Sequence, residues 1–271
     1  MDCGLADRQE VLDHSRRFGG IARLYGSAAL ARFINAHLCV IGIGGVGSWV
    51  AEALARSAVG AVTLIDLDNV AESNVNRQIH ALDGQFGRAK VDVMAERMQA
   101  INPLCRVERI EEFVEADDPG RWIDGRFDYV VDCIDAYRTK AALIAHCRRH
   151  RIPLITVGGA GGQVDPLKIV LADLSRTEQD PLLSKTRKLL RSDYGFSRDP
   201  KRRFSVPCVY SSEQQRVPKS AAQACGTDGA ASGITGLNCA GFGASVAVTA
   251  SFGLVAVAHV LNKLADSGGG G

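Results

Sequence analysis

Residues 40–48 read VIGIGGVGS, an apolar run that breaks into a glycine-rich loop. Gly42, Gly44 and Gly47 match the pattern G-x-G-x-x-G, which joins a buried strand to a helix in nucleotide-binding folds. The first glycine permits the tight turn, the second lets backbone approach a phosphate, and the third lets the helix pack on the strand. Backbone N–H groups at the helix N-terminus then face the anion. The loop predicts a phosphate site, and taken alone it fits NAD, FAD, S-adenosylmethionine and ATP equally well.

Outward from this loop, strand-like apolar runs alternate with helical segments, from HLCVIGI (residues 37–43) to QVDPLKIVLAD (residues 163–173). The alternation predicts an α/β, Rossmann-like fold, with a mainly parallel sheet and helices on both faces. We expect a glycine-broken helical elbow over residues 10–35 before this core and a buried apolar helix over about 240–262 after it. The 271 residues suffice for one large α/β domain with a full core, or for two small domains.

The segment from about 175 to 232 is polar, basic and weakly periodic, and we interpret it as a long loop or a crossover segment that is partly mobile. Between Lys185 and Arg203 it carries eight lysines and arginines against two aspartates, whereas the whole chain has a net charge of only +2. This asymmetry indicates an acidic partner for the segment.

The eight cysteines show no C-x-x-C spacing, so free thiols in a reducing cytosol are expected and no structural zinc. The N-terminus lacks the features of a signal peptide. Residues 233–261 contain no Lys, Arg, Asp or Glu and are long enough to span a membrane. Their richness in Gly, Ala, Ser and Thr favours a buried helix instead. A cytoplasmic protein is expected, with peripheral membrane attachment through this helix left open.

The polar loop after the second predicted strand separates ATP from the other nucleotides. Asp66 ends that strand, 19 residues after Gly47, where it can accept hydrogen bonds from ribose hydroxyls. The following residues bring together an amide, two cations and a second carboxylate. A dehydrogenase that binds one pyrophosphate needs no such set, whereas a site that breaks the bond between the α- and β-phosphates does. In this sequence the amide is Asn74, which can orient the α-phosphate. The cations are Arg77 and Lys90, which can neutralise the β- and γ-phosphates. The carboxylate is Asp135, which follows the fourth predicted strand and can hold Mg²⁺.

Four motifs then carry a family resemblance: GIGGVGS, LIDLDNVAESNVNRQ, GRAK and DCIDAYRTK. In this order and spacing they resemble the ubiquitin-activating-enzyme-like superfamily, which includes adenylating enzymes of the molybdopterin and thiamin pathways. The resemblance implies a single adenylating-enzyme domain over 1–271, with its matched core in 17–170. The resemblance implies that a carboxylate attacks the α-phosphate of Mg-ATP, giving an acyl-adenylate and pyrophosphate. It implies cofactor contacts from Gly42, Gly44, Gly45, Gly47, Asp66, Asp68, Asn74, Arg77, Gln78 and Lys90, with Asp135 as metal ligand and Arg77, Lys90, Asp135 and Arg23 as catalytic residues.

Three of these assignments keep an alternative. Asp68 and Gln78 can equally brace the loop without touching the ligand. The superfamily completes its site with an arginine from the partner subunit of a homodimer. Here the corresponding element reads RRFGGIARLYG, so either Arg23 or Arg17 can take that role. Asp132, three residues before Asp135, is expected to end its strand structurally.

The departures from the superfamily indicate a subfamily. Sulfur-carrier-activating members usually carry two C-x-x-C pairs, and ubiquitin-relaying members carry a cysteine domain that this length cannot accommodate. RFGGIARLYG, GGAGGQVDP and CVYSSEQ resemble the bacterial tRNA threonylcarbamoyladenosine dehydratases instead. That resemblance implies an AMP- and pyrophosphate-forming cyclase, which activates the threonyl carboxylate of a modified adenosine beside the anticodon. The side chain then closes on itself with overall loss of water.

The inferred RNA substrate assigns a role to the basic segment. Phosphates of tRNA are expected to contact Lys185, Arg187, Lys188, Arg191, Lys201, Arg202 and Arg203, with Tyr194 and Phe196 available to stack on bases. The main alternative is an adenylyltransferase for a sulfur-carrier C-terminus. A dehydrogenase and a non-catalytic scaffold are the other rivals, and a cysteine-desulfurase-system or sulfur-acceptor protein is a further candidate partner.

Overall fold

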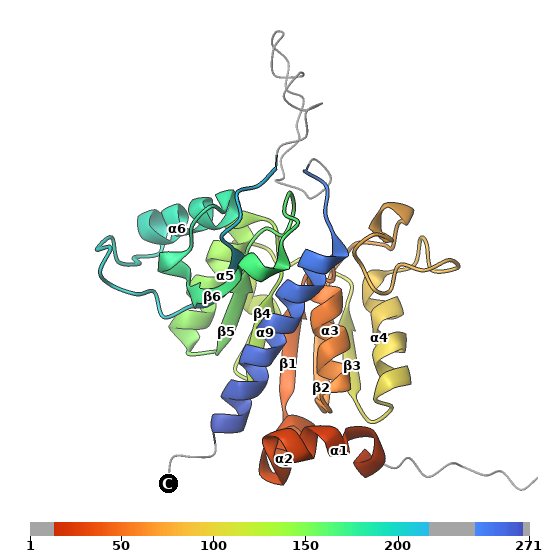
Figure 1. Cartoon of the computed structure of the whole chain (residues 1–271). Coiled ribbons are helices and arrows are strands. Elements are labelled where there is room, and N and C mark those ends of the chain that lie inside the picture. The colour runs from red at the N-terminus through yellow and green to blue at the C-terminus, as the bar shows by residue number, and fades with distance from the viewer. Residues whose placement is uncertain (1–13, 217–241, 268–271) are drawn as a thin grey trace, which may run out of the picture.

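A computed structural model of the chain describes residues 14–216 and 242–267, which form one seven-stranded sheet covered by helices (Figure 1). The strands are β1 (His37–Ile41), β2 (Ala61–Ile65), β3 (Arg106–Ile110), β4 (Tyr129–Asp132), β5 (Leu154–Val157), β6 (Ile169–Asp173) and β7 (Pro207–Ser211). Their order is β3-β2-β1-β4-β5-β7-β6, and all neighbours pair in parallel except β6 with β7. The predicted Rossmann-like fold is confirmed.

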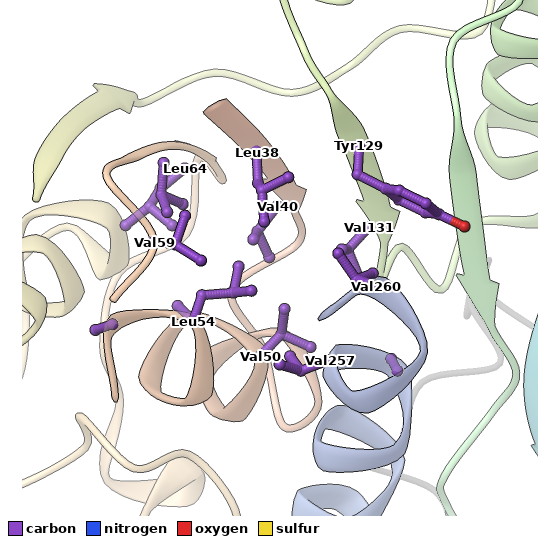
Figure 2. Close-up of a cluster of buried hydrophobic side chains, with 14 of the residues drawn as sticks. Leu38, Val40, Val50, Leu54, Val59, Leu64, Tyr129, Val131, Val257 and Val260 are labelled. Atoms are coloured by element: carbon purple, nitrogen blue, oxygen red, sulfur yellow. The ribbon is translucent and has the colours of Figure 1, made fainter. Parts of the chain in front are cut away.

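Helices cover both faces of this sheet. They are α1 (His14–Tyr25), α2 (Ser27–Asn35), α3 (Gly47–Arg56), α4 (Lys90–Ile101), α5 (Tyr137–His150), α6 (Pro181–Asp193) and α9 (Val246–Asp266). Helices α3, α4 and α9 share one hydrophobic core with the sheet, and α5 and α6 share a second core on the opposite face. Strand β1 contributes side chains to both cores, because successive side chains of a strand point to opposite faces of the sheet. Leu38 and Val40 pack with α3 and α9 (Figure 2), while Cys39 and Ile41 face α5.

The C-terminal apolar segment forms α9, which begins at Val246 and ends at Asp266, a few residues later than predicted at each end. It packs beside α3, and Gly253 is needed there because a Cβ would lie 2.9 Å from the carbonyl oxygen of Val46. Helix α9 is long and apolar enough to cross a membrane, yet 44% of its most apolar window is buried within the protein. The helix therefore serves as a core helix of this domain.

The prediction of a loop over residues 175–232 is wrong for the part that the structure describes. Residues 181–193 form α6, and residues 207–211 form β7 inside the sheet; residues 217–232 lie outside the described ranges. Asp180 caps α6 by accepting a hydrogen bond from Leu183 N. The helix buries Leu182, Leu183, Thr186 and Leu190. The helical pattern was masked because five charged residues, Lys185, Arg187, Lys188, Arg191 and Asp193, are interspersed with its four leucines.

The N-terminal elbow exists, but the break falls at Gly26 rather than at the paired glycines of RRFGGIARLYG. Helix α1 continues through Gly19 and Gly20, and Gly26 adopts a φ of +88°, a backbone conformation that favours glycine. Helices α1 and α2 lie together across one end of the sheet, opposite the end where α9 begins (Figure 1). This placement decides which predicted site residues can meet within one chain.

Candidate active site

A cavity of about 770 Å³ opens at the carboxyl ends of the central strands. The chain runs outward from β1 to β3 on one side and from β4 to β5 on the other, so the strand order reverses between β1 and β4. Ligands of open α/β sheets bind in the crevice at such a point. Of the predicted residues, the cavity is lined by Gly42, Gly44, Gly45, Asp66, Asp68, Asn74, Arg77, Gln78, Lys90 and Asp135.

The glycine loop has the geometry that its pattern predicts. Gly42 has a φ of +85°, and a Cβ on Gly47 would lie 1.8 Å from the carbonyl oxygen of Gly42, so no side chain fits there. Gly45 lies against the side chain of Arg77. Val46, the N-cap residue of α3, makes no side-chain hydrogen bond to the first turn. The loop and the positive end of α3 are therefore available to an anion.

Asp66 fastens this loop to the end of β2. Its Oδ2 accepts a hydrogen bond from Ile43 N at 2.5 Å, and its Oδ1 accepts one from Asp68 N at 2.8 Å. Burial raises the pKa of Asp66, and the nearby charge of Lys90 opposes that shift. Each carboxylate oxygen has further lone pairs. Asp66 can therefore hold the loop and still accept hydrogen bonds from a ligand.

Lys90 lies at a buried position where a cation needs a negatively charged partner. It is the first residue of α4, and only 6% of its surface is exposed. A positive charge at a helix N-terminus opposes the helix dipole. Its Nζ lies 2.7 Å from Asp68 Oδ2, so Asp68 braces Lys90 at the cavity wall.

Three neighbouring side chains complete this wall. Asn74 Oδ1 accepts from Ala71 N and so closes the turn. Arg77 Nη1 donates to Ser73 O at 2.6 Å. Gln78 is 5% exposed, and its Oε1 has no hydrogen-bond partner among the described residues. A buried acceptor without a partner is costly, which favours a ligand contact for Gln78.

His80 follows closely and is buried, with neither ring nitrogen hydrogen-bonded within the described ranges. Burial, reinforced by the charges of Lys90 and Arg97, lowers the pKa of His80 from 6.5 to about 4. Below pH 6.5 the unfolded chain binds a proton here that the folded protein does not, so folding stability is lost as the pH falls towards 4.

Replacing His80 with leucine should therefore flatten the acid side of the stability profile. We expect wild type to lose about 2 kcal/mol more than the variant between pH 8 and pH 5. Urea unfolding at several pH values measures this difference. A change in packing alters the free energy of unfolding equally at every pH, so subtracting the value at pH 8 removes it. Parallel profiles for the two proteins would contradict the assignment.

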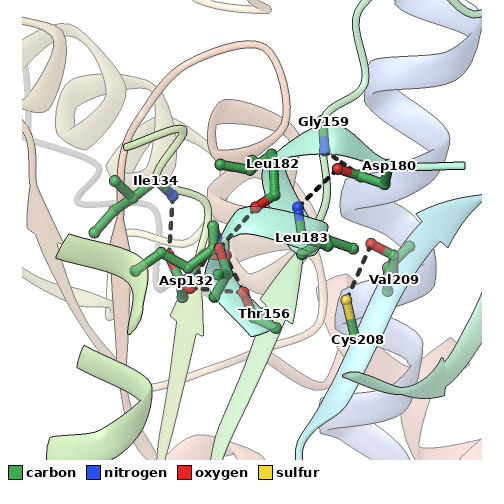
Figure 3. A network of polar contacts seen from close by, with 11 residues as sticks. Asp132, Ile134, Thr156, Gly159, Asp180, Leu182, Leu183, Cys208 and Val209 are labelled. Atoms are coloured by element: carbon green, nitrogen blue, oxygen red, sulfur yellow. Dashed lines mark hydrogen bonds and ion pairs between the residues drawn. The ribbon is translucent and has the colours of Figure 1, made fainter. Parts of the chain in front are cut away.

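Asp135 and Asp132 have different environments, as expected. Asp135 is exposed and lines the cavity from the loop between β4 and α5. Asp132 is fully buried: its Oδ2 lies 2.8 Å from Lys140 Nζ, Thr156 Oγ1 donates to it at 2.6 Å, and its Oδ1 accepts from Ile134 N (Figure 3). The structural role of Asp132 is confirmed. Through its hydrogen bond from Ile134 N, Asp132 holds the loop that carries Asp135.

Sequence reasoning missed Lys140, Thr156 and Asp180. Asp180 Oδ2 accepts a hydrogen bond from Gly159 N at 2.8 Å and its Oδ1 accepts from Leu183 N, so it ties α6 to the cavity wall (Figure 3). Burial raises the pKa of Asp180, although its backbone hydrogen bonds oppose the shift. A lysine at i+8 from an aspartate was the one available signal, and it is too common to interpret alone.

The N-terminal arginines do not join the cavity of their own chain. Arg23 is exposed on α1, and Arg17 Nη1 of the same helix donates to Ile101 O. Helix α1 lies across the opposite end of the sheet (Figure 1). Neither lines the cavity. If either arginine completes a site, it must be that of another copy of the chain.

The basic segment divides into exposed and engaged residues. Lys185, Lys188, Lys201, Arg202 and Arg203 are exposed. Arg187 donates to Thr177 Oγ1, and the Arg191 guanidinium lies 5.1 Å from the centre of the Phe204 ring. Phe196 is only 6% exposed and packs on Phe204, so its predicted availability for base stacking is wrong.

Within the described ranges, no cluster of three or more His, Cys, Asp or Glu side chains is arranged to hold a metal ion. Mg²⁺ rarely needs such a cluster, because one or two carboxylates and substrate phosphates suffice. Asp135 together with a triphosphate on the glycine loop is a donor set of that kind.

A family model for the ThiF family matches residues 15–269. The chain belongs to the ThiF family. Among its relatives, the tRNA threonylcarbamoyladenosine dehydratase of Escherichia coli is 53% identical over 92% of this chain and 93% of the relative. The dehydratase of Haemophilus influenzae is 49% identical over 96% and 98%. A crystal structure of the E. coli enzyme in complex with ATP superimposes with a TM-score of 0.84, at 49% identity over 94% of this chain and 96% of that one.

Membership of the ThiF family confirms the resemblance read from the four motifs. The matched region extends from α1 to the end of α9, so it covers both the nucleotide cavity and the elements around the basic segment. The family match therefore covers essentially the whole described domain and not only the glycine loop.

Proposed function

We propose that this protein dehydrates threonylcarbamoyladenosine in tRNA, next to the anticodon, in an ATP-dependent cyclisation. The observation that carries the proposal is full-length similarity to two dehydratases together with a cavity that unites Asn74, Arg77, Lys90 and Asp135. A threonyl carboxylate oxygen attacks the α-phosphorus of ATP and pyrophosphate leaves. A nucleophilic atom of the carbamoyl group then attacks the acyl carbon, and AMP leaves. Over both steps the modified base loses one water.

The residues of the cavity serve the first step. We assign the ribose to Asp66 and the phosphates to the glycine loop, Asn74, Arg77 and Lys90. The two cations neutralise charge that develops on the leaving pyrophosphate, an electrostatic effect that is strong in a partly buried site. Asp135 would hold Mg²⁺, which supplies further neutralisation of the phosphates.

The second step needs no nucleophile from the protein. The attacking carbamoyl group belongs to the same side chain as the adenylate, and intramolecular attack has a large effective concentration. Cys133 lines the cavity, but burial raises its pKa to about 12, so at neutral pH the thiol stays protonated. A thiol in that state is a poor nucleophile. The proposed mechanism therefore uses no relay through Cys133.

Further expectations concern partners and place. We infer that the chain acts as one adenylating domain in a homodimer, with Arg23 of each copy completing the cavity of the other. The exposed lysines and arginines of the basic segment support contact with tRNA phosphates. We place the enzyme in the cytoplasm, and Mg-ATP is its cofactor.

The proposal is tested by incubating the protein with ATP, Mg²⁺ and tRNA that carries threonylcarbamoyladenosine. Nucleoside mass spectrometry should then detect loss of one water from that nucleoside, together with AMP and pyrophosphate. An unchanged nucleoside mass would refute the function. ATP–pyrophosphate exchange dependent on a sulfur-carrier C-terminus, without dehydration, would support the alternative adenylyltransferase.

A further inference from the structure

The cavity has an acidic stretch in its wall, and two cations lie beside another part of that wall. One wall is formed by residues 112–117, which follow β3 and include Glu112, Glu115 and Asp117. Arg121 pairs with Glu112 at 3.0 Å. An RNA backbone is repelled by carboxylates, so this wall is unfavourable for its approach.

Another part of the wall is formed by the starts of α5 and α6. Tyr137, the first residue of α5, follows Asp135 and Ala136, which line the cavity. The Arg138 guanidinium lies 5.8 Å from the centre of the Tyr137 ring, and Arg138 Nε donates to the Tyr137 hydroxyl at 3.2 Å. Lys185 Nζ of α6 lies 5.7 Å from the same ring. One aromatic ring thus gathers two cations beside the cavity.

The positions of these two cations are fixed by the protein, but their charges are not paired within the described ranges. Lys185 lies one helical turn after Pro181, which lines the cavity, and Asp180 bonds the start of α6 to Gly159 of the cavity wall. Arg138 and Lys185 are exposed residues, and neither takes part in an ion pair among the described residues. Their charge is therefore available to an external anion.

We propose that Tyr137, Arg138 and Lys185 form a rim clamp for an RNA phosphate next to the modified nucleotide. In this arrangement Arg138 and Lys185 contact the phosphate, and Tyr137 is a positioning residue that keeps both cations at the rim. The RNA enters over α5 and α6, away from residues 112–117. The inference deepens the proposed function and rests on it for the identity of the RNA.

The direct test compares two arginines of the same helix. Arg138→Ala should weaken tRNA binding about tenfold and lower the slope of log K against log salt by about one, as expected for one lost phosphate contact. Arg149→Ala is the matched control, because Arg149 is exposed on α5 about 16 Å farther along the helix. It should change binding less than twofold. ATP affinity should stay at the wild-type value in both variants.

Tyr137 provides a second readout. Tyr137→Phe keeps the ring and should retain most tRNA affinity, whereas Tyr137→Leu should weaken it severalfold with ATP affinity unchanged. Equal affinities for Arg138→Ala and Arg149→Ala, or for Tyr137→Leu and Tyr137→Phe, would overturn the clamp. This failure differs from that of the proposed function, in which wild type itself would leave the modified base unchanged.

The direction of entry can be tested separately by photo-crosslinking. A benzophenone side chain in place of Arg138 should crosslink to anticodon-loop nucleotides, and one in place of Glu115 should not. Crosslinks from position 115 alone would overturn the proposed side of approach.

Discussion

Asp135→Ala should lower the rate of dehydration about a hundred- to a thousandfold at saturating ATP and tRNA. The size follows from the loss of one preorganised charge-stabilising group at the reacting phosphates. Asp135 lines the cavity from an exposed loop position, so its carboxylate can hold Mg²⁺ without support from other acidic clusters. The rate is measured in single turnovers by nucleoside mass spectrometry.

The structure makes this variant easy to control. The loop that carries Asp135 is held by Asp132, which accepts from Ile134 N, so removing the Asp135 carboxylate leaves that anchor in place. Asp83→Ala removes an exposed carboxylate that does not line the cavity and should leave the rate unchanged. AMP affinity, which requires no metal, should be equal in all three proteins. A rate within threefold of wild type would exclude Asp135 as the metal ligand.

Lys140→Met should lower the free energy of unfolding by about 3–5 kcal/mol, the largest stability effect that we expect from one substitution. Lys140 and Asp132 are both fully buried and form an ion pair at 2.8 Å. Methionine is unbranched like lysine and only one heavy atom shorter, so little packing is lost. The cost comes from leaving the Asp132 carboxylate buried without its counter-charge.

Urea unfolding of a double-mutant cycle tests this explanation. Asp132→Asn in the Lys140→Met background removes the uncompensated charge and should recover a large part of the loss. Arg109→Met breaks an exposed pair with Asp92 and should cost less than about 1 kcal/mol. If the double variant is less stable than wild type by the sum of the two single losses, the two residues do not act as a pair.

Local patterns were sufficient where one short segment contains the whole signal. The glycine loop, the polar residues from Asp66 to Gln78, and the order of strands and helices up to β6 could all be predicted. Each depends on backbone conformation or on residues within one or two turns of each other. The family resemblance could be recognised for the same reason, because each of its motifs is one uninterrupted stretch of sequence, and the family match confirmed it.

The failures have an equally physical origin. Helix α6 was missed because its few apolar residues are outnumbered by charges, and its burial depends on packing against α5. Phe196 was misassigned because nothing adjacent to it in sequence indicates that Phe204 covers it. Arg187 and Arg191 look like their exposed neighbours until Thr177 and Phe204 are placed beside them.

The sequence by itself determined the type of fold, the glycine loop and the set of groups that suit ATP, because these follow from local conformation and from chemistry carried by adjacent residues. Only the tertiary structure decided which charges are buried, which remain exposed, and which face the cavity. It joined Lys140 to Asp132, brought Tyr137 and Arg138 of α5 beside Lys185 of α6, and placed α1, the helix that contains Arg23, at the far end of the sheet. Such long-range contacts depend on how the layers pack, and no segment of the chain specifies them alone.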